Sequence, residues 1–205
     1  MILATTFGSE QILAFGNEEQ KKKYLPPLAK GEKICAACYT EPQAGSDVAG
    51  IKTRADKDGD EYVINGTKMF ITNGTIADYY IVLARTDPNP PKRHHGMSVF
   101  LVEKDMPGVQ ANKLTNKLGI RASDTAEVVF KNVRVPKENL IGQEGQGFYQ
   151  TMMFFNVTRI PVAFQAVGLA QGAFELAYHY ARNREVFERK LSSFQVTQEK
   201  LAKMR

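Results

Sequence analysis

Residues 34–136 hold a series of short runs rich in β-branched and aromatic residues, with turn-forming residues between them and no long helical stretch. The clearest runs are Tyr79–Arg85, Met97–Glu103 and residues 126–131. Runs of this length and composition predict β-strands. Because no helix separates them, their connections suit antiparallel neighbours. This part of the chain is therefore predicted to form an antiparallel β-barrel or sandwich, not a doubly wound sheet.

Two tight turns are predicted inside this β-rich region. Residues 65–66 are Asn-Gly, and they lie between the strand-like runs 62–64 and 69–72. An Asn-Gly pair in this position is a strong β-hairpin signal. Residues 58–60, Asp-Gly-Asp, predict another turn. A last short strand is expected at residues 133–135.

Helical patterns flank the β-rich region on both sides. Asn17 is predicted to cap a helix, because its side chain can accept from the backbone and two glutamates follow in the first turn. Pro26 and Pro27 are expected to break or restart this helix. Beyond residue 145 apolar residues recur at helical spacing. A second helix begins near Phe194 and still runs at Arg205, which suggests that the sequence ends inside a domain.

The composition excludes several classes of protein. Of the 205 residues, 43% are hydrophobic and 24% are charged, as is usual for a globular protein. A disordered tail, a collagen-like fibre and a disulfide scaffold are therefore not expected. The longest apolar runs, such as residues 79–84, are far shorter than the ~20 residues of a membrane span, so no membrane partner is expected.

The net charge of +5 leaves two interpretations open. The basic residues are scattered, as on a solvated surface, yet they could also attract an anion such as a nucleotide cofactor or coenzyme A. Because no nucleic-acid motif is present, no nucleic-acid partner is expected.

Cys35 and Cys38 are the two cysteines, and their C-x-x-C spacing is also that of a redox pair or half a zinc site. No second pair of ligands occurs at zinc-like spacing, so buried thiols are predicted and no metal is expected. Low cysteine usage fits a reducing compartment. The first residues lack the pattern of a signal peptide, so a cytoplasmic location is expected.

Two loops carry candidate chemistry. Residues 39–47 follow a strand and combine hydroxyls with proline and glycine, which suits either an ordinary turn or a loop that binds an oxygen-rich ligand. Residues 70–74 combine an aromatic ring, a hydroxyl and a turn, which suits either a core Phe or a contact with a flat cofactor ring. The histidines, His94, His95 and His179, lie beside no serine or cysteine nucleophile and are expected to be solvated.

These same segments resemble the signatures of the acyl-CoA dehydrogenase family. Residues 40–47 resemble its TEPxAGSD signature, and residues 68–74 resemble K-x-[WYF]-I-T-N-[GA]. Residues 117–125 resemble K-x-G-x-R-x-S-x-T, and residues 130–136 resemble F-x-x-V-x-V-P. The helical part matches at Arg159, at residues 168–171, and at Arg184, Phe187 and Gln195. The resemblance covers essentially the whole chain in order.

The resemblance implies an α+β protein of several domains. Residues 1–33 would end an N-terminal helical domain, residues 34–144 would form the middle β domain, and residues 145–205 would begin a C-terminal helical bundle. The implied activity is α,β-dehydrogenation of acyl-CoA thioesters, as in fatty acid β-oxidation, with FAD as the hydride acceptor. The implied partners are an acyl-CoA substrate, further subunits in a homodimer or homotetramer, and electron-transfer flavoprotein as acceptor. In a eukaryote the implied location is the mitochondrial matrix.

The resemblance also assigns roles to individual residues. Residues 39–46 would line FAD, with Thr40 near its isoalloxazine ring. Phe70 stands where many members have Trp and would cover one face of the flavin, and Thr72 would bond near its reactive nitrogen. The full set implied for FAD is Cys38, Tyr39, Thr40, Gly45, Ser46, Phe70, Ile71, Thr72, Arg184, Phe187 and Gln195, the last three reaching the FAD of a neighbouring subunit. The set implied for acyl-CoA is Ser46, Asn156 and Arg159.

Several positions depart from the family pattern. Asn156 stands where many members have Asp, and Glu185 and Val186 replace a common Lys-Thr. The glutamate base of most members would lie beyond Arg205, and the alternative position before Arg159 is occupied by Thr158. No catalytic residue is therefore identified, and the 205-residue chain is expected to be inactive and to bind FAD weakly or not at all. A non-catalytic binding module and a related flavin oxidase or monooxygenase remain alternatives.

Overall fold

The computed structural model describes residues 7–205, which fall into two compact units. The first unit extends to Phe154 and the second is Phe155–Arg205, and each is described by itself. The expectation about a signal peptide concerns residues 1–6 and lies outside the described residues.

Two short helices open the first unit, α1 (Ser9–Phe15) and α2 (Glu18–Ala29). Asn17 caps α2 as predicted. Its Oδ1 accepts from the backbone N–H of Gln20 at 2.8 Å, and Gln20 Oε1 accepts from the backbone N–H of Asn17 at 3.1 Å. This reciprocal pair is a capping box, which supplies partners for two backbone donors at the start of the helix.

The prediction that two prolines break this helix is wrong. Pro26 and Pro27 both lie inside α2, close to its C-terminal end. The backbone N–H of Lys30 still donates to the carbonyl of Pro26 at 3.1 Å, so the last turn is closed behind the prolines. A proline inside a helix lacks a donor and crowds the carbonyl four residues before it, and so near the end of α2 it weakens the helix without ending it.

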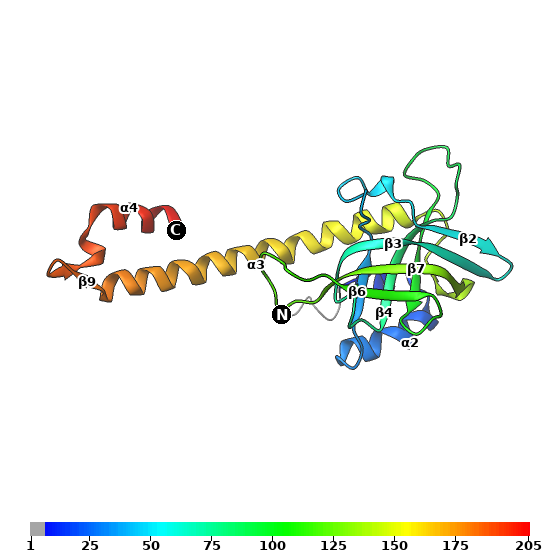
Figure 1. The fold of residues 1–205 in the computed structure, drawn as a ribbon, viewed down its shortest axis with the longest axis horizontal. Coiled ribbons are helices and arrows are strands. Elements are labelled where there is room, and N and C mark those ends of the chain that lie inside the picture. The colour runs from blue at the N-terminus through cyan, green and yellow to red at the C-terminus, as the bar shows by residue number, and fades with distance from the viewer. Residues whose placement is uncertain (1–6) are drawn as a thin grey trace. The chain divides into compact units, whose positions relative to one another are not determined.

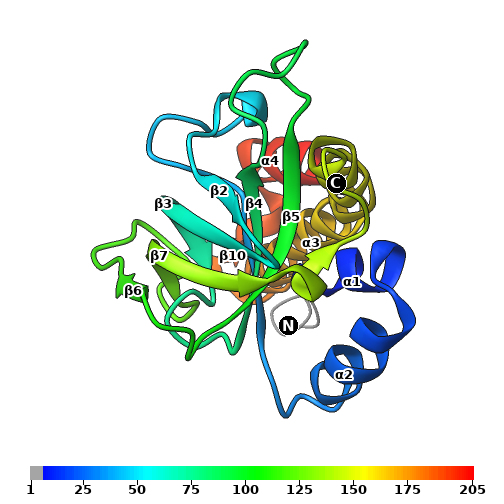
Figure 2. The ribbon, with the colours of Figure 1, turned by 90° about the vertical axis from the view of Figure 1, so that its right-hand side faces the viewer.

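Eight strands of the described residues form one sheet in the first unit, shown in Figures 1 and 2. They are β1 (Cys35–Cys38), β2 (Arg54–Asp58), β3 (Glu61–Thr72), β4 (Tyr79–Arg85), β5 (Met97–Glu103), β6 (Val109–Lys113), β7 (Thr125–Pro136) and β8 (Leu140–Ile141). Their order is β6-β7-β3-β2-β4-β5-β8, with β1 also paired to β4. Short 3₁₀ helices occupy Val48–Gly50 and Lys137–Asn139. The α+β class with a β-rich middle region is confirmed.

The strand pairing is mostly antiparallel, as predicted, with two exceptions. β1 runs parallel to β4 over four residue pairs, and β2 meets β4 in parallel at Arg54 and Arg85. The chain between β1 and β4 contains the whole β2–β3 hairpin. This connection is long enough to bring the chain back in the parallel direction without a crossover helix.

The prediction of a hairpin at Asn65-Gly66 is wrong, because β3 runs straight through both residues. The turn lies instead between β2 and β3, at the Asp-Gly-Asp segment that also predicted one. The pairing of β3 with β7 shifts register between Ile64 and Gly66, which marks a bulge. A Cβ on Gly66 would lie 2.2 Å from Oγ1 of Thr53, so the glycine is needed for close approach of a neighbouring segment.

The two strands predicted at residues 126–131 and 133–135 are one continuous strand, β7. Asn132 interrupts it locally with a positive φ of 51°, and its backbone N–H donates to Oδ1 of Asn65 at 2.8 Å. β2 and β6 were not predicted, because β2 buries one residue of five and β6 buries none fully. Strands so exposed lack the apolar alternation on which sequence reasoning depends.

The hydrophobic core of this unit lies on one face of the sheet and draws on β1, β3, β4, β5 and β7. Its largest members include Tyr80, Phe100 and Phe130, which are almost completely buried. Tyr80 and Phe130 meet edge to face with ring centroids 6.3 Å apart. Such contacts add a directional preference to the burial of apolar area.

The second unit is helical apart from one small hairpin. α3 (Gly147–Asn183) begins in the first unit and continues into the second, with Pro161 inside it. A hairpin of β9 (Glu185–Val186) and β10 (Arg189–Lys190) follows, then a 3₁₀ turn at Leu191–Ser193 and α4 (Gln195–Met204). The second helix predicted near Phe194 is confirmed.

By length and composition alone, α3 is long and apolar enough to span a membrane, and it is the one such helix among the described residues. Its best 18-residue window has a mean hydropathy of 1.2. Sequence reasoning from uninterrupted apolar runs did not single it out, because small and polar residues are spaced along it. Core helices of globular proteins can be equally long and apolar, so this property assigns no membrane role.

Candidate functional site

The structure joins the two candidate loops to each other. The backbone N–H of Met69, in β3, donates to the carbonyl of Thr40 at 2.8 Å. At this point β3 is bulged, because its register with β7 shifts between Lys68 and Ile71. The bulge frees residues 69 and 70 from the ladder with β7, so residues 39–41 can contact the strand there.

Phe70 occupies an unusual conformation at this bulge. Its φ is +60°, a left-handed value that is costly for a bulky residue, and its side chain is 68% exposed. A strained backbone that presents a large aromatic ring to solvent is a reason to suspect a binding role. The alternative of an ordinary core Phe is excluded.

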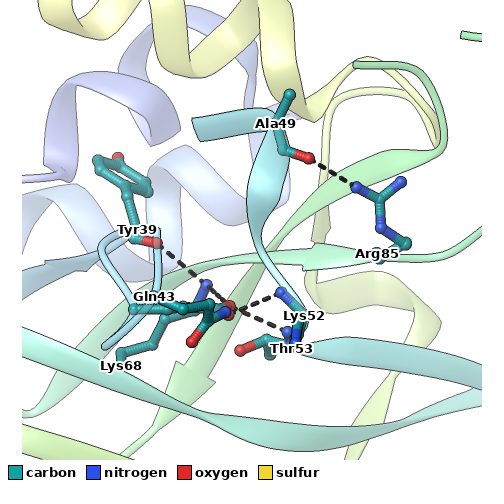
Figure 3. A network of polar contacts seen from close by, with 8 residues as sticks. Tyr39, Gln43, Ala49, Lys52, Thr53, Lys68 and Arg85 are labelled. Carbon is teal, nitrogen blue, oxygen red and sulfur yellow. Dashed lines mark hydrogen bonds and ion pairs between the residues drawn. The ribbon is translucent and has the colours of Figure 1, made fainter. Parts of the chain in front are cut away.

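A buried ion pair joins the same two segments, within the network drawn in Figure 3. Nζ of Lys68 lies 2.8 Å from Oε1 of Glu41, and both side chains are almost completely buried. The same ammonium donates to the carbonyl of Tyr39 at 3.2 Å. The Glu41 carboxylate also accepts the backbone N–H groups of Lys52 and Thr53 at 2.6 and 2.9 Å. Each charge therefore has several partners, as a buried charge requires.

The pKa values of this pair show that each partner depends on the other. Burial by itself raises the pKa of Glu41, but the Lys68 charge and the donated hydrogen bonds outweigh it and bring the pKa down to about 2. Burial lowers the pKa of Lys68, and the Glu41 charge opposes that shift. Loss of either partner would leave an uncompensated buried charge.

The structure places the remaining residues of the first loop at different depths. The side chains of Cys38 and Ile71 are buried in the core, so any ligand contact of theirs must use the backbone. Tyr39 is buried, with its ring 5.3 Å from that of Phe154. Thr40 is half-buried, as is Thr72, whereas Gly45 and Ser46 are exposed.

The far end of this loop is tied to the connection between β4 and β5. Asp47 Oδ2 accepts from Arg93 Nη2 at 2.6 Å, although both side chains are exposed. Arg85 Nη2 donates to the carbonyl of Ala49 at 3.0 Å, as Figure 3 shows. The exposed stretch that carries Gly45 and Ser46 is thus anchored on both sides.

The second unit brings together Arg184, Phe187 and Gln195 around the β9–β10 hairpin. Phe187 lies in its turn with a φ of +48° and is 89% exposed, like a second Phe70. Its ring lies 6.4 Å from that of Phe194, which precedes Gln195 at the start of α4. The carbonyl of Arg184 accepts the N–H of Leu191 at 2.8 Å, and this bond joins the two ends of the β9–β10 hairpin.

Asn156 and Arg159 lie one helical turn apart on α3 and are both exposed. Nη1 of Arg159 donates to Oδ1 of Asn156 at 2.7 Å. This bond orients the guanidinium and leaves its other donors available for a phosphate or carboxylate. Thr158 between them has no acidic group, so the structure offers no base at this place.

The structure also shows the surroundings of the cysteines and histidines that the sequence analysis considered. Cys35 and Cys38 are buried free thiols, as predicted, and burial raises the pKa of Cys38 to about 12. Residues 7–205 contain no cluster of side chains that could hold a metal ion. The expectation of solvated histidines is met by the exposed His179 only. His94 and His95 are both half-buried, and the His94 ring lies 5.3 Å from that of Phe148.

Sequence reasoning missed the ion pair under the site. Both partners belong to the recognised segments, yet they lie 27 residues apart and carry no local signal of pairing. The strand-like run was predicted to begin at residue 69, so the sequence did not place Lys68 at an inward position. A fully buried lysine is rare unless it is paired.

Known proteins resemble this chain along its whole length. Residues 36–133 match the acyl-CoA dehydrogenase middle domain, residues 145–205 its C-terminal domain and residues 1–32 its N-terminal domain. An acyl-CoA dehydrogenase of Bacillus subtilis (strain 168) is 46% identical over 200 residues, which are 98% of this chain and 52% of that protein. The crystal structure of acyl-CoA dehydrogenase from Geobacillus kaustophilus superposes with a TM-score of 0.95 at 44% identity, covering 98% of this chain and 53% of that one.

A further solved structure is that of acyl-CoA dehydrogenase complexed with FAD from Bacillus anthracis. Its TM-score is 0.91 at 43% identity, and the match covers 98% of this chain and 35% of that one. The chain spans about half the length of the curated relatives it matches. Three domains of one family match in chain order, and the segments 40–47 and 68–74 that first suggested it are in contact in the structure. The chain therefore belongs to the acyl-CoA dehydrogenase family.

Proposed function

We propose that the whole protein is an FAD-dependent acyl-CoA dehydrogenase that introduces an α,β double bond into an acyl-CoA thioester. The observation that carries the proposal is the strained, exposed Phe70 ring, set beside the Thr40 backbone by a bulge in β3. Family membership supplies the reaction class. The contact between the two signature segments supplies a site in which that reaction's cofactor can lie.

The residues present fit a flavin. Phe70 offers a flat apolar face, and Thr72, two residues further along the same strand, offers a hydroxyl on a half-buried side chain. Thr40, Gly45 and Ser46 add hydroxyls and backbone groups from the loop. We assign the ring of FAD to this surface, with Cys38, Tyr39 and Ile71 contributing backbone atoms alone.

We assign the second group of FAD contacts, Arg184, Phe187 and Gln195, to the cofactor of a neighbouring subunit. Support comes from Phe187, which shares with Phe70 both a left-handed backbone and an almost bare aromatic ring. Two strained, exposed aromatics at the positions that the family resemblance assigns to FAD are consistent with two halves of one shared site. This assignment implies a homodimer or homotetramer.

The acyl-CoA substrate is assigned to Ser46, Asn156 and Arg159. Arg159, oriented by Asn156, suits a phosphate or carbonyl oxygen of the coenzyme. FAD, when bound, supplies the hydride acceptor of the reaction. The chain's own residues bind and orient the two reactants, and we expect the carboxylate that removes the α-proton to lie in the protein beyond Arg205.

The remaining assignments complete this proposal. Residues 1–33 would be the end of the N-terminal domain, 34–144 the middle domain and 145–205 the start of the C-terminal bundle. We propose electron-transfer flavoprotein as the electron acceptor. A cytoplasmic location, or the mitochondrial matrix in a eukaryote, fits the buried free thiols.

The test is to express the full reading frame that contains these residues and to assay it with a panel of acyl-CoA thioesters. We expect a yellow protein with a flavin absorption band that bleaches on addition of a suitable thioester. Phe70→Gly should lower FAD affinity by about tenfold without loss of stability, since glycine adopts a positive φ freely. A colourless protein that takes up no added FAD would refute the proposal.

The 205-residue chain serves as a second sample in the same assay. We expect no acyl-CoA-dependent reduction of an artificial electron acceptor, because no catalytic base is identified among these residues. Measurable turnover by this chain would show that a base lies within it and would overturn that part of the proposal.

A further inference from the structure

We propose that the buried Glu41–Lys68 ion pair is the positioning device of the flavin site. It holds residues 39–41 against the bulge of β3, so that Thr40 and the Phe70 ring face the cofactor together. The inference rests on the proposed function, because it names what orients the site described there. Neither residue touches the exposed surface itself, since both side chains are buried.

The bonds of the pair connect consecutive residues of two segments. Lys68 Nζ donates to Tyr39 O and to Glu41 Oε1, at 3.2 and 2.8 Å. The next residue, Met69, donates its backbone N–H to Thr40 O at 2.8 Å. Residues 39, 40 and 41 are therefore all bonded to residues 68 and 69, and Phe70 follows at once. A slip of one residue between the segments would break all three bonds together.

The carboxylate also draws in a third segment. Glu41 accepts the N–H groups of Lys52 and Thr53, so it joins the connection before β2 to the same point. A carboxylate has two oxygens that both accept, whereas the amide of glutamine has one acceptor oxygen and two donor hydrogens. Glutamine at residue 41 would therefore place donors against donors on at least one side.

Stability alone does not account for such a pair. Taking two charges out of water is costly, and well-packed neutral side chains are often at least as stable in the same place. The ion pair fixes how the two segments are aligned, because its hydrogen bonds can form in one register and one orientation only. Packing of neutral side chains imposes no such alignment. The strained φ of Phe70 supports the same conclusion. A strained backbone conformation persists only where the surrounding structure holds it in place.

The test compares four variants of the full reading frame. They are Lys68→Met, Glu41→Gln, the double variant Glu41→Gln/Lys68→Met, and Lys137→Met as a matched control. Lys137 forms an exposed ion pair with Asp60, 2.6 Å long, by the turn that precedes β3. Each protein is measured for FAD dissociation constant by flavin fluorescence, for its visible flavin spectrum, and for its urea midpoint.

The single variants should lose stability, because each leaves one buried charge unpaired, and the double variant should recover part of it. The FAD dissociation constant should rise about tenfold in the single variants and stay raised in the double variant. The visible flavin spectrum should be shifted in every variant whose FAD dissociation constant is raised. Lys137→Met should match the unchanged protein in all three measurements. FAD affinity that returns in step with stability in the double variant would overturn the inference, as would wild-type affinity in Lys68→Met.

A second measurement separates this inference from the proposed function. Hydrogen exchange at the Met69 amide of the 205-residue chain, without any flavin, reports the bond to Thr40. We expect protection in the unchanged chain and exchange at least about tenfold faster in Lys68→Met. Equal exchange in both would overturn the positioning role even if FAD binds. Absence of FAD binding by the unchanged full protein would instead refute the proposed function.

Discussion

Glu41 illustrates how one side chain in a signature can serve geometry instead of chemistry. An acid in a binding loop invites the role of a catalytic base, yet its oxygens are taken by Lys68 and by the backbone N–H groups of Lys52 and Thr53. A base needs a free lone pair within reach of the substrate proton. At the scale of single residues, the exposed Phe70 and the buried Glu41 thus have opposite functions within one small region.

The buried state of Glu41 predicts a specific loss of stability in acid. Its pKa falls from 4.5 to about 2 on folding, so its contribution is present above about pH 4.5 and disappears as the pH falls toward 2. The free energy of unfolding should therefore be lower at pH 2 than at pH 6. Urea denaturation of the 205-residue chain between pH 6 and pH 2 measures this loss.

Glu41→Gln should be less stable at neutral pH and should lose much less on acidification, because no carboxyl titrates at that position. Asp60→Asn is the control, since the exposed Asp60 pairs with Lys137 in solvent and contributes little. If Glu41→Gln kept the full acid slope of the unchanged chain, another group would be responsible.

At the scale of elements, β3 is the strand that builds the site. It is long, carries two register shifts against β7, and places Gly66 at one shift and Phe70 at the other. The first shift lets β3 lie close to Thr53, whose neighbour Lys52 also binds Glu41. The second shift turns the Phe70 ring outward. Bulges of this kind re-aim side chains near binding sites.

Gly66→Ala should therefore destabilise the first unit by about 2 kcal/mol, because the new methyl group would overlap Thr53. Thermal and urea unfolding, followed by far-UV circular dichroism, would measure this change. Gly119→Ala is the matched control, because nothing lies within 4 Å of its added Cβ and its φ is not in the left-handed range. An equal and small effect of both substitutions would show that the close approach at Gly66 is relaxed in solution.

At the scale of the whole chain, the two units differ in how they bury apolar residues. The first unit buries its core against one face of the sheet, whereas α3 exposes large apolar side chains along its course. Phe164, Leu169 and Leu176 are each more than 70% exposed. Isolated globular domains rarely leave apolar surface of this extent uncovered.

The purified 205-residue chain should consequently self-associate in a concentration-dependent way. Sedimentation velocity across a wide range of concentrations would show the shift to larger species. Leu169→Glu/Leu176→Glu should move the chain toward the monomer, and Gln171→Glu should not, since it adds charge without removing apolar surface. A chain that sediments as a monomer at every concentration would contradict this prediction.

The strands β4 and β5, the cap at Asn17 and the family itself follow from the sequence alone. Apolar runs, local capping and spaced signatures depend on residues that are close in the chain, and so they can be recognised in the sequence alone. The exposed strands β2 and β6 could not be recognised in the sequence, because strands with few buried residues do not show that pattern. The Asn-Gly hairpin was predicted wrongly for a related reason, since a local turn signal lost to long-range pairing of β3 with β7.

The functional residues divide in the same way. The signatures located Thr40, Phe70 and Thr72 at a candidate site by sequence. The tertiary structure decided which members face outward and which support them, because that division depends on contacts between residues far apart in the chain. Lys68 and Glu41 meet across 27 residues, and only in the folded state does burial make their charges require each other.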